Sequence, residues 1–204
     1  MEGATYDGRR FDTEDWYGTE LHGQRFTACT FADVDLTECR TRGSTFEECS
    51  FAGCRFNASQ HLGTAFVGCQ FRRVSWFSAT LDGCKLSGSL FVECVLRPLT
   101  VVGGQWRGVM LRGADLTGVD LTGVNLGDAD LSEAALRNAV LRSCDLSGAA
   151  LRRAGLQGAD LRQADLTAAD LTGCQLDGTR VDLQTAVLLA EAQGAVVDLD
   201  TSDE

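Results

Sequence analysis

The chain has 204 residues, a formal net charge of −11 and a hydrophobic content of 44%, which is ordinary for a globular protein. A negative charge without a basic stripe argues against binding to nucleic acid, because the phosphate backbone would be repelled. The longest aliphatic run, residues 186–190, is too short to cross a membrane, and the N-terminus has no apolar stretch typical of a signal sequence. We therefore expect a cytoplasmic protein that binds neither a membrane nor a nucleic acid.

Large apolar residues recur at every fifth position from Phe11 to Val181, and only Thr41 and His61 interrupt the series. A helix returns to the same face about every 3.6 residues and a strand about every 2, so neither element buries a period of five. Small residues stand two positions before most of the large ones, as at residues 29, 34, 114, 119 and 129, and glycine is frequent two positions after them. The five-residue repeat is therefore itself the structural unit, with its small and its large residue facing inward.

In the second half the repeat reads Ala-Asp-Leu, as at residues 114–116, 129–131 and 164–166, and it resembles the pentapeptide repeat family. The resemblance implies an all-β fold, a right-handed quadrilateral parallel β-helix in which four pentapeptides form one square turn. We assign residues 1–181 to this β-helix. A short C-terminal α-helix and tail are expected over residues 182–204.

All nine cysteines occupy the small inward position of the repeat. Free cysteine behaves as a small apolar side chain, so we expect these thiols in the core, with no disulfide, no metal and no cofactor. Thr41 and His61 lie one four-sided turn apart and would stack on each other. We expect them to form a hydrogen-bonded polar pair inside the rod.

A joint between two stacked segments is expected near residues 96–106. The large inward residues change there from mostly phenylalanine to leucine, beside Pro98, the single proline of the chain. Proline removes a backbone donor and the pair Gly103-Gly104 loosens the chain, so we expect a kink or offset, although the period of five continues.

Beyond Val181 the repeat stops, and Asp182 can cap a helix over residues 183–193 that Gly194 ends. Such a helix can plug the open end of a solenoid or contact a second copy of the chain. Its apolar residues, which we assign to dimerisation, are Leu183, Ala186, Val187, Leu189 and Ala190.

Residues 88–101 and 180–194 resemble the mycobacterial quinolone-resistance branch of the family, the MfpA type. Members of that branch bind DNA gyrase as dimers joined through their C-termini. The resemblance therefore implies a homodimer through the C-terminus and DNA gyrase, a type II topoisomerase, as the partner.

Catalytic chemistry is not expected. The chain has two histidines, one outward and one at an inward position, and a regular convex rod offers no cleft in which a catalytic triad could converge. Its glycines recur in one outward column and form no phosphate-binding loop. We expect a binding protein and not an enzyme.

The negative charge is concentrated in the second half of the chain. Residues 111–204 carry 16 acids and 7 bases, a net charge of −9, whereas residues 1–110 carry 13 acids and 11 bases. In a four-sided turn, the face that we rank first for partner contact carries Asp128, Asp145 and Asp165. The second rank comprises Asp115, Asp120, Asp130, Asp160 and Asp170.

The resemblance implies a DNA mimic that binds and inhibits gyrase and protects it from quinolones or other topoisomerase poisons. The Qnr-type relatives owe protection to loops that interrupt the repeat, and no insertion interrupts it here. Two alternatives remain: a structural or scaffolding protein without a topoisomerase partner, and a self-resistance factor against a topoisomerase-targeting antibiotic.

Overall fold

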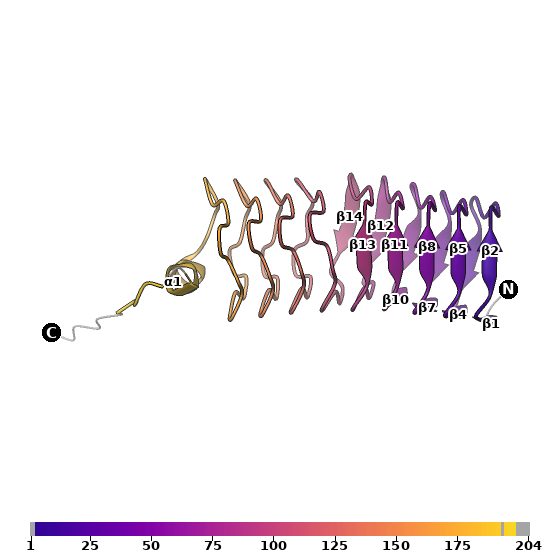
Figure 1. Cartoon of the computed structure of the whole chain (residues 1–204), viewed down its shortest axis with the longest axis horizontal. Coiled ribbons are helices and arrows are strands. Elements are labelled where there is room, and N and C mark those ends of the chain that lie inside the picture. Colours follow the sequence, from indigo (N-terminus) through magenta and orange to yellow (C-terminus); the bar gives the residue numbers. More distant parts are fainter. Residues whose placement is uncertain (1–2, 193, 199–204) are drawn as a thin grey trace.

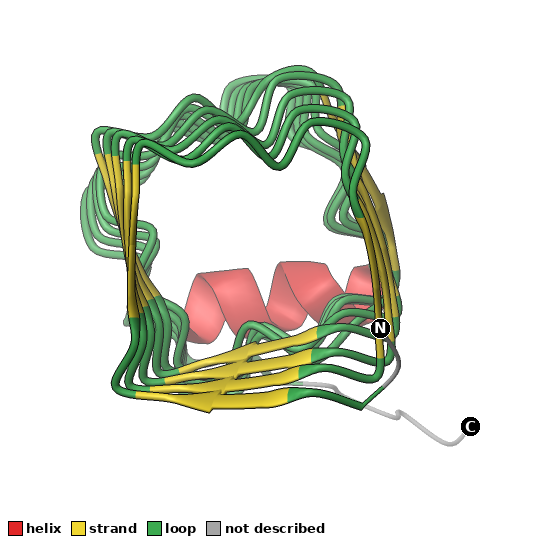
Figure 2. Cartoon of the chain, turned by 90° about the vertical axis from the view of Figure 1, so that its right-hand side faces the viewer, coloured by secondary structure: helices red, strands yellow, loops and turns green. Residues whose placement is uncertain are grey.

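The computed structural model describes residues 3–192 and 194–198 of the chain. These residues wind into a parallel β-solenoid, a straight rod with a square cross-section (Figures 1 and 2). The N-terminal turn forms one end of the rod, and a helix lies across the other end. The quadrilateral β-helix with a short C-terminal helix is thereby confirmed.

The described residues contain fourteen short strands in three parallel sheets. One sheet contains β1 (Thr5–Asp7), β4 (Arg25–Thr27), β7 (Thr45–Glu47) and β10 (Ala65–Val67). The second contains β13 (Leu90–Val92), β11 (Gln70–Arg72), β8 (Ser50–Ala52), β5 (Thr30–Ala32) and β2 (Arg10–Asp12). The third contains β14 (Leu99–Val102), β12 (Ala79–Asp82), β9 (Gln60–Leu62), β6 (Arg40–Arg42) and β3 (Glu20–His22).

Paired strands are offset by one turn of four pentapeptides, so that Phe26 lies opposite both Tyr6 and Phe46. On the fourth face, isolated bridges such as the one from Asp15 to Asp35 pair residues with the same offset of one turn. Beyond β14, single bridges on all four faces join the remaining turns up to Arg180. The rod therefore keeps one register along its length.

A residue with positive φ closes most pentapeptides, which explains the glycine, asparagine and aspartate at this position. Gly118 has a φ of 72° and Asn138 a φ of 56°. Glycine adopts such angles without a steric penalty, and asparagine tolerates them better than most residues do. The local chemistry of the repeat thus turns the chain by one corner after each large inward side chain.

The large inward side chains form one continuous core. In the first five turns phenyl rings stack face to face, with centroids 4.7 Å apart for Phe26 and Phe46 and 4.5 Å apart for Phe31 and Phe51. Leucines such as Leu126 and Leu146 fill the same position in the later turns and are fully buried. Each turn therefore buries its apolar surface on its neighbours, as a solenoid requires.

The cysteines lie in the inward column that the sequence predicted, and all nine are free. Seven are buried, and Cys94 and Cys174 are partly exposed. Six of the seven buried thiols contact a carbonyl oxygen of the preceding turn; Cys54 Sγ, for example, donates to Phe31 O over 3.4 Å. Burial raises the pKa of the Cys54 thiol to about 11, so the side chain acts as a neutral filler.

Thr41 and His61 form the polar pair expected in the core. Thr41 Oγ1 lies 2.7 Å from His61 Nδ1, and Ser59 Oγ lies 2.9 Å from His61 Nε2. All three residues are buried. Burial lowers the pKa of His61 to about 3, so the imidazole is neutral and both ring nitrogens are satisfied by hydroxyl groups.

Backbone hydrogen bonding between turns is interrupted near Pro98. Among the described residues, no backbone hydrogen bond joins residues 93–103 to residues 112–122. The regular step resumes beyond the interruption, as in the bridge from Asp115 to Ala135. Two faces of the square are affected, and the other two remain bonded.

α1 (Leu183–Ala192) lies across the last turn (Figure 2). Leu188 and Leu189 pack against the core, and the buried Thr185 donates from Oγ1 to Leu161 O over 3.4 Å. The helix therefore covers inward residues that would otherwise face water at the end of the solenoid.

The neutral His61 should make the folded state sensitive to acid. The unfolded chain binds a proton at this histidine near pH 6.5 and the folded chain does not, so stability from this group is lost as the pH falls, by about 1.4 kcal/mol per pH unit between pH 6 and 4. The variant Thr41→Leu/His61→Leu should have a shallower pH dependence of the free energy of unfolding. Urea denaturation at several pH values measures the difference. The control His22→Gln, at a half-exposed histidine, should keep the wild-type slope.

Candidate partner-binding surface

The eight aspartates selected from the sequence all project from the outward positions of the last turns, and the structure divides them into two groups. Four form ion pairs and four do not, among the residues that the structure describes. The ion pairs are Arg97–Asp115, Arg107–Asp128, Arg152–Asp170 and Arg162–Asp160. Half of the candidate set is therefore partly neutralised within the chain.

Asp128 belongs to the neutralised group although the sequence ranked it first. Its carboxylate pairs with the guanidinium of Arg107, which projects from the preceding turn. Glu133 and Arg112 repeat the arrangement on the next face, with 2.7 Å between Nη2 and Oε1. Both acids sit at corners with positive φ, from which the side chain reaches diagonally across to the preceding turn.

Asp145 and Asp165 form a stacked pair on one face, in successive turns joined by a parallel bridge. Asp145 Oδ1 accepts a hydrogen bond from Ser147 N over 3.0 Å, and Asp165 Oδ1 accepts one from Thr167 N over 2.9 Å. Neither carboxylate has an ion-pair partner in the described part of the chain. The backbone thus holds two uncompensated negative charges in a fixed orientation.

The charge on Asp165 persists at neutral pH. Hydrogen bonds from the hydroxyl and the backbone amide of Thr167 hold the pKa of this carboxyl below its usual value. One turn before Asp145, Asn125 makes the same contact as the aspartates, accepting from Gly127 N over 3.0 Å. The position therefore requires a side-chain oxygen for the turn but not a charge.

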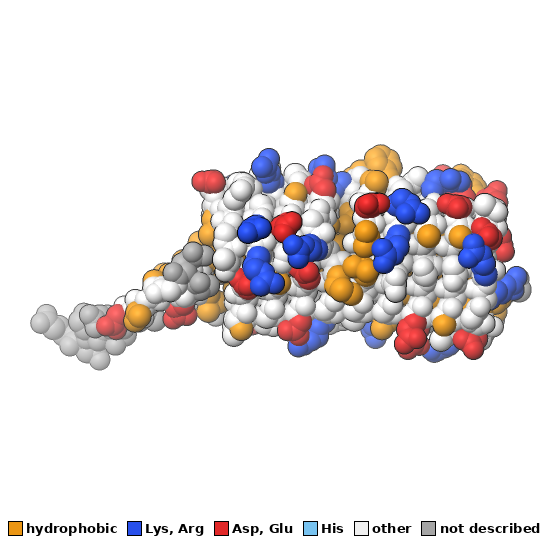
Figure 3. Space-filling view, in the orientation of Figure 1, with side chains coloured by type: hydrophobic (Ala, Val, Ile, Leu, Met, Phe, Trp, Pro, Cys, Tyr) orange, Lys and Arg blue, Asp and Glu red, His pale blue; other side chains and the backbone are white. Residues whose placement is uncertain are grey.

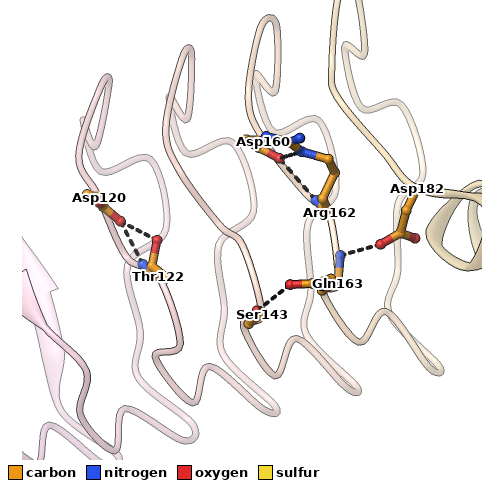
Figure 4. A network of polar contacts seen from close by, with 7 residues as sticks. All are labelled: Asp120, Thr122, Ser143, Asp160, Arg162, Gln163 and Asp182. Carbon is orange, nitrogen blue, oxygen red and sulfur yellow. Dashed lines mark hydrogen bonds and ion pairs between the residues drawn. The ribbon is translucent and has the colours of Figure 1, made fainter.

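Asp120 and Asp130 lie on the two faces that flank this stack. Asp120 Oδ1 accepts from Thr122 N over 2.9 Å and from Thr122 Oγ1 over 2.6 Å (Figure 4). Asp130 Oδ1 accepts from Ser132 N over 3.0 Å. Like Asp145 and Asp165, they accept a turn-closing hydrogen bond and have no ion-pair partner among the described residues.

Asp160, in contrast, is held in an ion pair within the chain. Arg162 donates to both of its oxygens, from Nε over 2.8 Å and from Nη2 over 2.6 Å (Figure 4). This contact lowers the pKa of Asp160 to about 2. Asp160 is also buried by the neighbouring side chains. A partner would meet the guanidinium of Arg162 beside this carboxylate, so Asp160 presents little free negative charge.

The distribution of charge differs between faces. On the face shown in Figure 3, basic and acidic side chains are interspersed over the last turns. The stack of Asp145 and Asp165 contrasts with this mixture. The unpaired negative charge is therefore confined to fewer positions than the net charge of residues 111–204 suggests.

The residues assigned to dimerisation lie in α1 and differ in environment. Leu183 is 77% exposed at the start of the helix, whereas Leu189 packs on the core of the rod. The remaining three, Ala186, Val187 and Ala190, are half-buried. The same helix therefore covers the solenoid on one side and presents apolar atoms on the other.

Asp182 joins this helix to the rod. Its Oδ1 accepts from Thr185 N over 2.9 Å, and its Oδ2 accepts from Gln163 N over 2.6 Å (Figure 4). The first contact is the helix cap that the sequence predicted, and the second reaches back one turn. These hydrogen bonds from the amides of Thr185 and Gln163 lower the pKa of Asp182.

Within residues 3–192 and 194–198, no group of three or more His, Cys, Asp or Glu side chains is arranged to hold a metal ion. Of the two histidines, His22 is half-exposed and His61 is enclosed in the core. No helix in the described part of the chain is both long enough and apolar enough to span a membrane.

Comparison with known proteins identifies the class of the repeat. Residues 101–128, 120–155 and 144–181 match the family model of pentapeptide repeats, in eight copies. The structure continues the same register through the preceding turns, so the whole rod has the repeating fold that the family model matches in residues 101–181. No protein of curated function matches it in sequence.

Solved structures share the fold over nearly the whole chain. A trypsin-treated variant of QnrB1, a plasmid-mediated fluoroquinolone resistance protein, has a TM-score of 0.65 at 20% identity, covering 97% of this chain and 99% of that one. Full-length QnrB1 has a TM-score of 0.58 at 22% identity, covering 94% and 100%. This likeness shows that the chain shares the fold of these structures.

Replacing Asp182 by alanine should loosen α1, because the helix loses both its cap and its tether to Gln163. We expect faster amide hydrogen exchange over residues 183–192, with little change in the turns before residue 160. Mass spectrometry of the exchanged protein measures both regions. Asp177→Ala, at an exposed acid of the last turn, is the matched control and should leave exchange in α1 at the wild-type rate.

Proposed function

We propose that the chain binds DNA gyrase in place of DNA, inhibits it, and protects it from quinolones or other topoisomerase poisons. The observation that carries the proposal is the stack of Asp145 and Asp165, two oriented carboxylates that no basic side chain of the described rod offsets. A groove that binds the DNA backbone presents basic side chains, and a rigid row of carboxylates is complementary to them.

The dimensions of the rod support the proposal. About nine turns at a spacing of about 4.8 Å give a monomer about 42 Å long. Two monomers joined at their C-terminal ends would span about 85 Å, close to about 25 base pairs of duplex DNA. The acidic halves of both chains would then meet at the centre of the assembly.

The charge density supports only partial mimicry. Duplex DNA of about 42 Å carries about 25 phosphates. The monomer has a net charge of −11, so it carries less than half of that charge. The net charge already includes the arginines that pair with Asp115, Asp128, Asp160 and Asp170, so these four positions are locally neutralised and the unpaired acids carry the exposed charge. We therefore assign the contact to Asp145 and Asp165 first, and to Asp120 and Asp130 second.

Dimerisation through α1 is part of the proposal. Leu183 is largely exposed, while Leu188 and Leu189 anchor the helix on the core. A second helix related by a twofold axis would bury Leu183 and the half-buried Val187 of each copy. Such an isologous contact is the usual way in which two identical chains associate.

The test of gyrase binding is supercoiling of relaxed plasmid by gyrase with increasing amounts of protein. The variant Asp145→Asn/Asp165→Asn removes two charges and keeps the turn, because Asn125 already makes the same backbone contact. We expect half-inhibition at a concentration about tenfold higher or more, since each chain of the proposed dimer loses two contacts at about 0.7 kcal/mol each.

The matched control is Asp115→Asn/Asp170→Asn, which changes the net charge equally at two ion-paired positions. It should inhibit within about twofold of the wild type. Equal loss in both variants would mean that net charge acts, and not this face. No inhibition by wild-type protein at micromolar concentration would favour a scaffolding role without a topoisomerase partner.

Protection is measured separately, as the amount of gyrase-cleaved DNA trapped by a quinolone. A protective protein lowers the trapped fraction at concentrations that leave supercoiling intact. Inhibition without this effect would restrict the function to gyrase binding. Protection against another topoisomerase poison but not against quinolones would favour a self-resistance factor.

The variant Leu183→Glu/Val187→Glu should be monomeric. Burying four carboxylates at a twofold contact would cost more free energy than the apolar contact supplies. Light scattering after size exclusion measures the mass. Gln184→Glu, at an exposed position of the same helix, should remain dimeric. A wild-type protein that is monomeric at high concentration would rule out the dimer, while the gyrase assay would still test the acidic face.

A further inference from the structure

The interruption near Pro98 is an opening in the wall of the rod, and we call it the seam. It lies between residues 93–103 of one turn and residues 112–122 of the next, on two adjacent faces. On the other two faces the same turns are bonded: Phe91 N donates to Met110 O over 3.0 Å, and Asn125 N donates to Gly104 O over 3.1 Å. Backbone hydrogen bonds thus join the two turns on two faces of the square, and none joins them on the two faces of the seam.

The sequence explains where the seam lies. In the following turn, Gly118 N donates to Arg137 O over 2.8 Å. Pro98 occupies the equivalent position one turn earlier and has no N–H to donate. Arg97 spans the opening instead, with Nη1 3.5 Å from Thr117 O and Nη2 2.5 Å from Asp115 Oδ2.

Solvent reaches inward residues at the seam. Cys94, Leu99, Val101 and Ala114 occupy inward positions and are partly exposed, whereas inward residues two turns on either side are fully buried. A cleft of about 390 Å³ opens between the two turns. Its lining residues are Arg97, Pro98, Leu99, Thr117, Gly118 and Val119.

Exposed apolar side chains lie on the N-terminal side of the opening. Phe77 is 50% exposed, Val95 is 49% exposed and Val102 is 54% exposed, on the same two faces as the seam. On the face shown in Figure 3, apolar side chains gather near the middle of the rod, at the level of β13 in Figure 1. Clustered apolar side chains on a charged surface are typical of an interaction site.

The unpaired backbone groups along β14 indicate which class of ligand the seam would bind. Elsewhere along the rod, groups equivalent to Leu99 O, Val101 N and Gly103 N bond to the next turn; here none of them has a backbone partner there. An alternating row of N–H and C=O groups is complementary to another polypeptide main chain. Arg97 and Asp115 offset each other at the opening, and Glu93 and Asp120 in the same two segments, which have no ion-pair partner among the described residues, disfavour an anionic ligand.

We propose that the seam binds an extended, apolar segment of a partner polypeptide, which forms main-chain hydrogen bonds along β14 and packs side chains against Val95 and Val102. The site lies outside the acidic stack and does not require gyrase as the partner. Main-chain pairing gives the affinity, and the apolar rim selects β-branched or aromatic side chains at alternate positions of the segment.

The test is selection from a displayed library of random heptapeptides on the intact protein, followed by binding of the selected synthetic peptides. We expect enrichment of peptides with alternating apolar residues, and amide chemical-shift changes confined to residues 93–103 and 112–122. A copy of the peptide with N-methyl groups at alternate residues should bind about tenfold more weakly, because it cannot donate along the edge.

The variant Val95→Lys/Val102→Lys places two charges on the rim at exposed positions and should also reduce binding about tenfold. The control Tyr17→Lys/Leu62→Lys changes two exposed apolar residues away from the seam and should bind like the wild type. The proposal is overturned if no peptide is enriched, if N-methylation leaves binding unchanged, or if the shift changes lie outside the seam.

Discussion

One constraint shapes the whole rod: a single large side chain in every five residues must be buried inside a square turn. The inward columns satisfy it by stacking on the turns above and below, as the parallel rings of Phe31 and Phe51 do. The other three positions of each repeat are then left to close the corner and to face water. Packing within the rod and chemistry on its surface are therefore largely independent of each other.

This separation explains how the core accommodates exceptions. His61 replaces an apolar residue, yet Thr41 and Ser59 satisfy both of its ring nitrogens, so no buried polar atom of the ring is left without a partner. Pro98 is a different exception, because it alters the main chain that links the turns. A change of side chain is accommodated within one inward column, whereas the proline lies where hydrogen bonds between turns are missing on two faces.

The sequence predicted the inward columns residue by residue, including the cysteines and the stacked pair of Thr41 and His61. The period of five separates inward from outward positions but does not specify how many sides a turn has, so the square shape came from the family resemblance. With four repeats of five residues in each turn, the sequence places Asp145 and Asp165 on one face, and the structure joins them there by a parallel bridge. The sequence did not predict the neutralisation of Asp128, because a corner side chain reaches diagonally to Arg107 and only the three-dimensional path reveals that contact. In the same way, Pro98 indicated a joint but not which faces it opens.

The turn-closing role of aspartate has a consequence for how such surfaces change over time. Asp145 and Asp165 close their turns through the same side-chain oxygens that make the face negative, and Asn125 closes a turn of the same column without a charge. A lineage can therefore gain or lose an anionic face by exchanging aspartate for asparagine, or by moving an arginine one turn along the rod, while every corner keeps its geometry. Selection on the electrostatic surface need not wait for compensating changes in the fold.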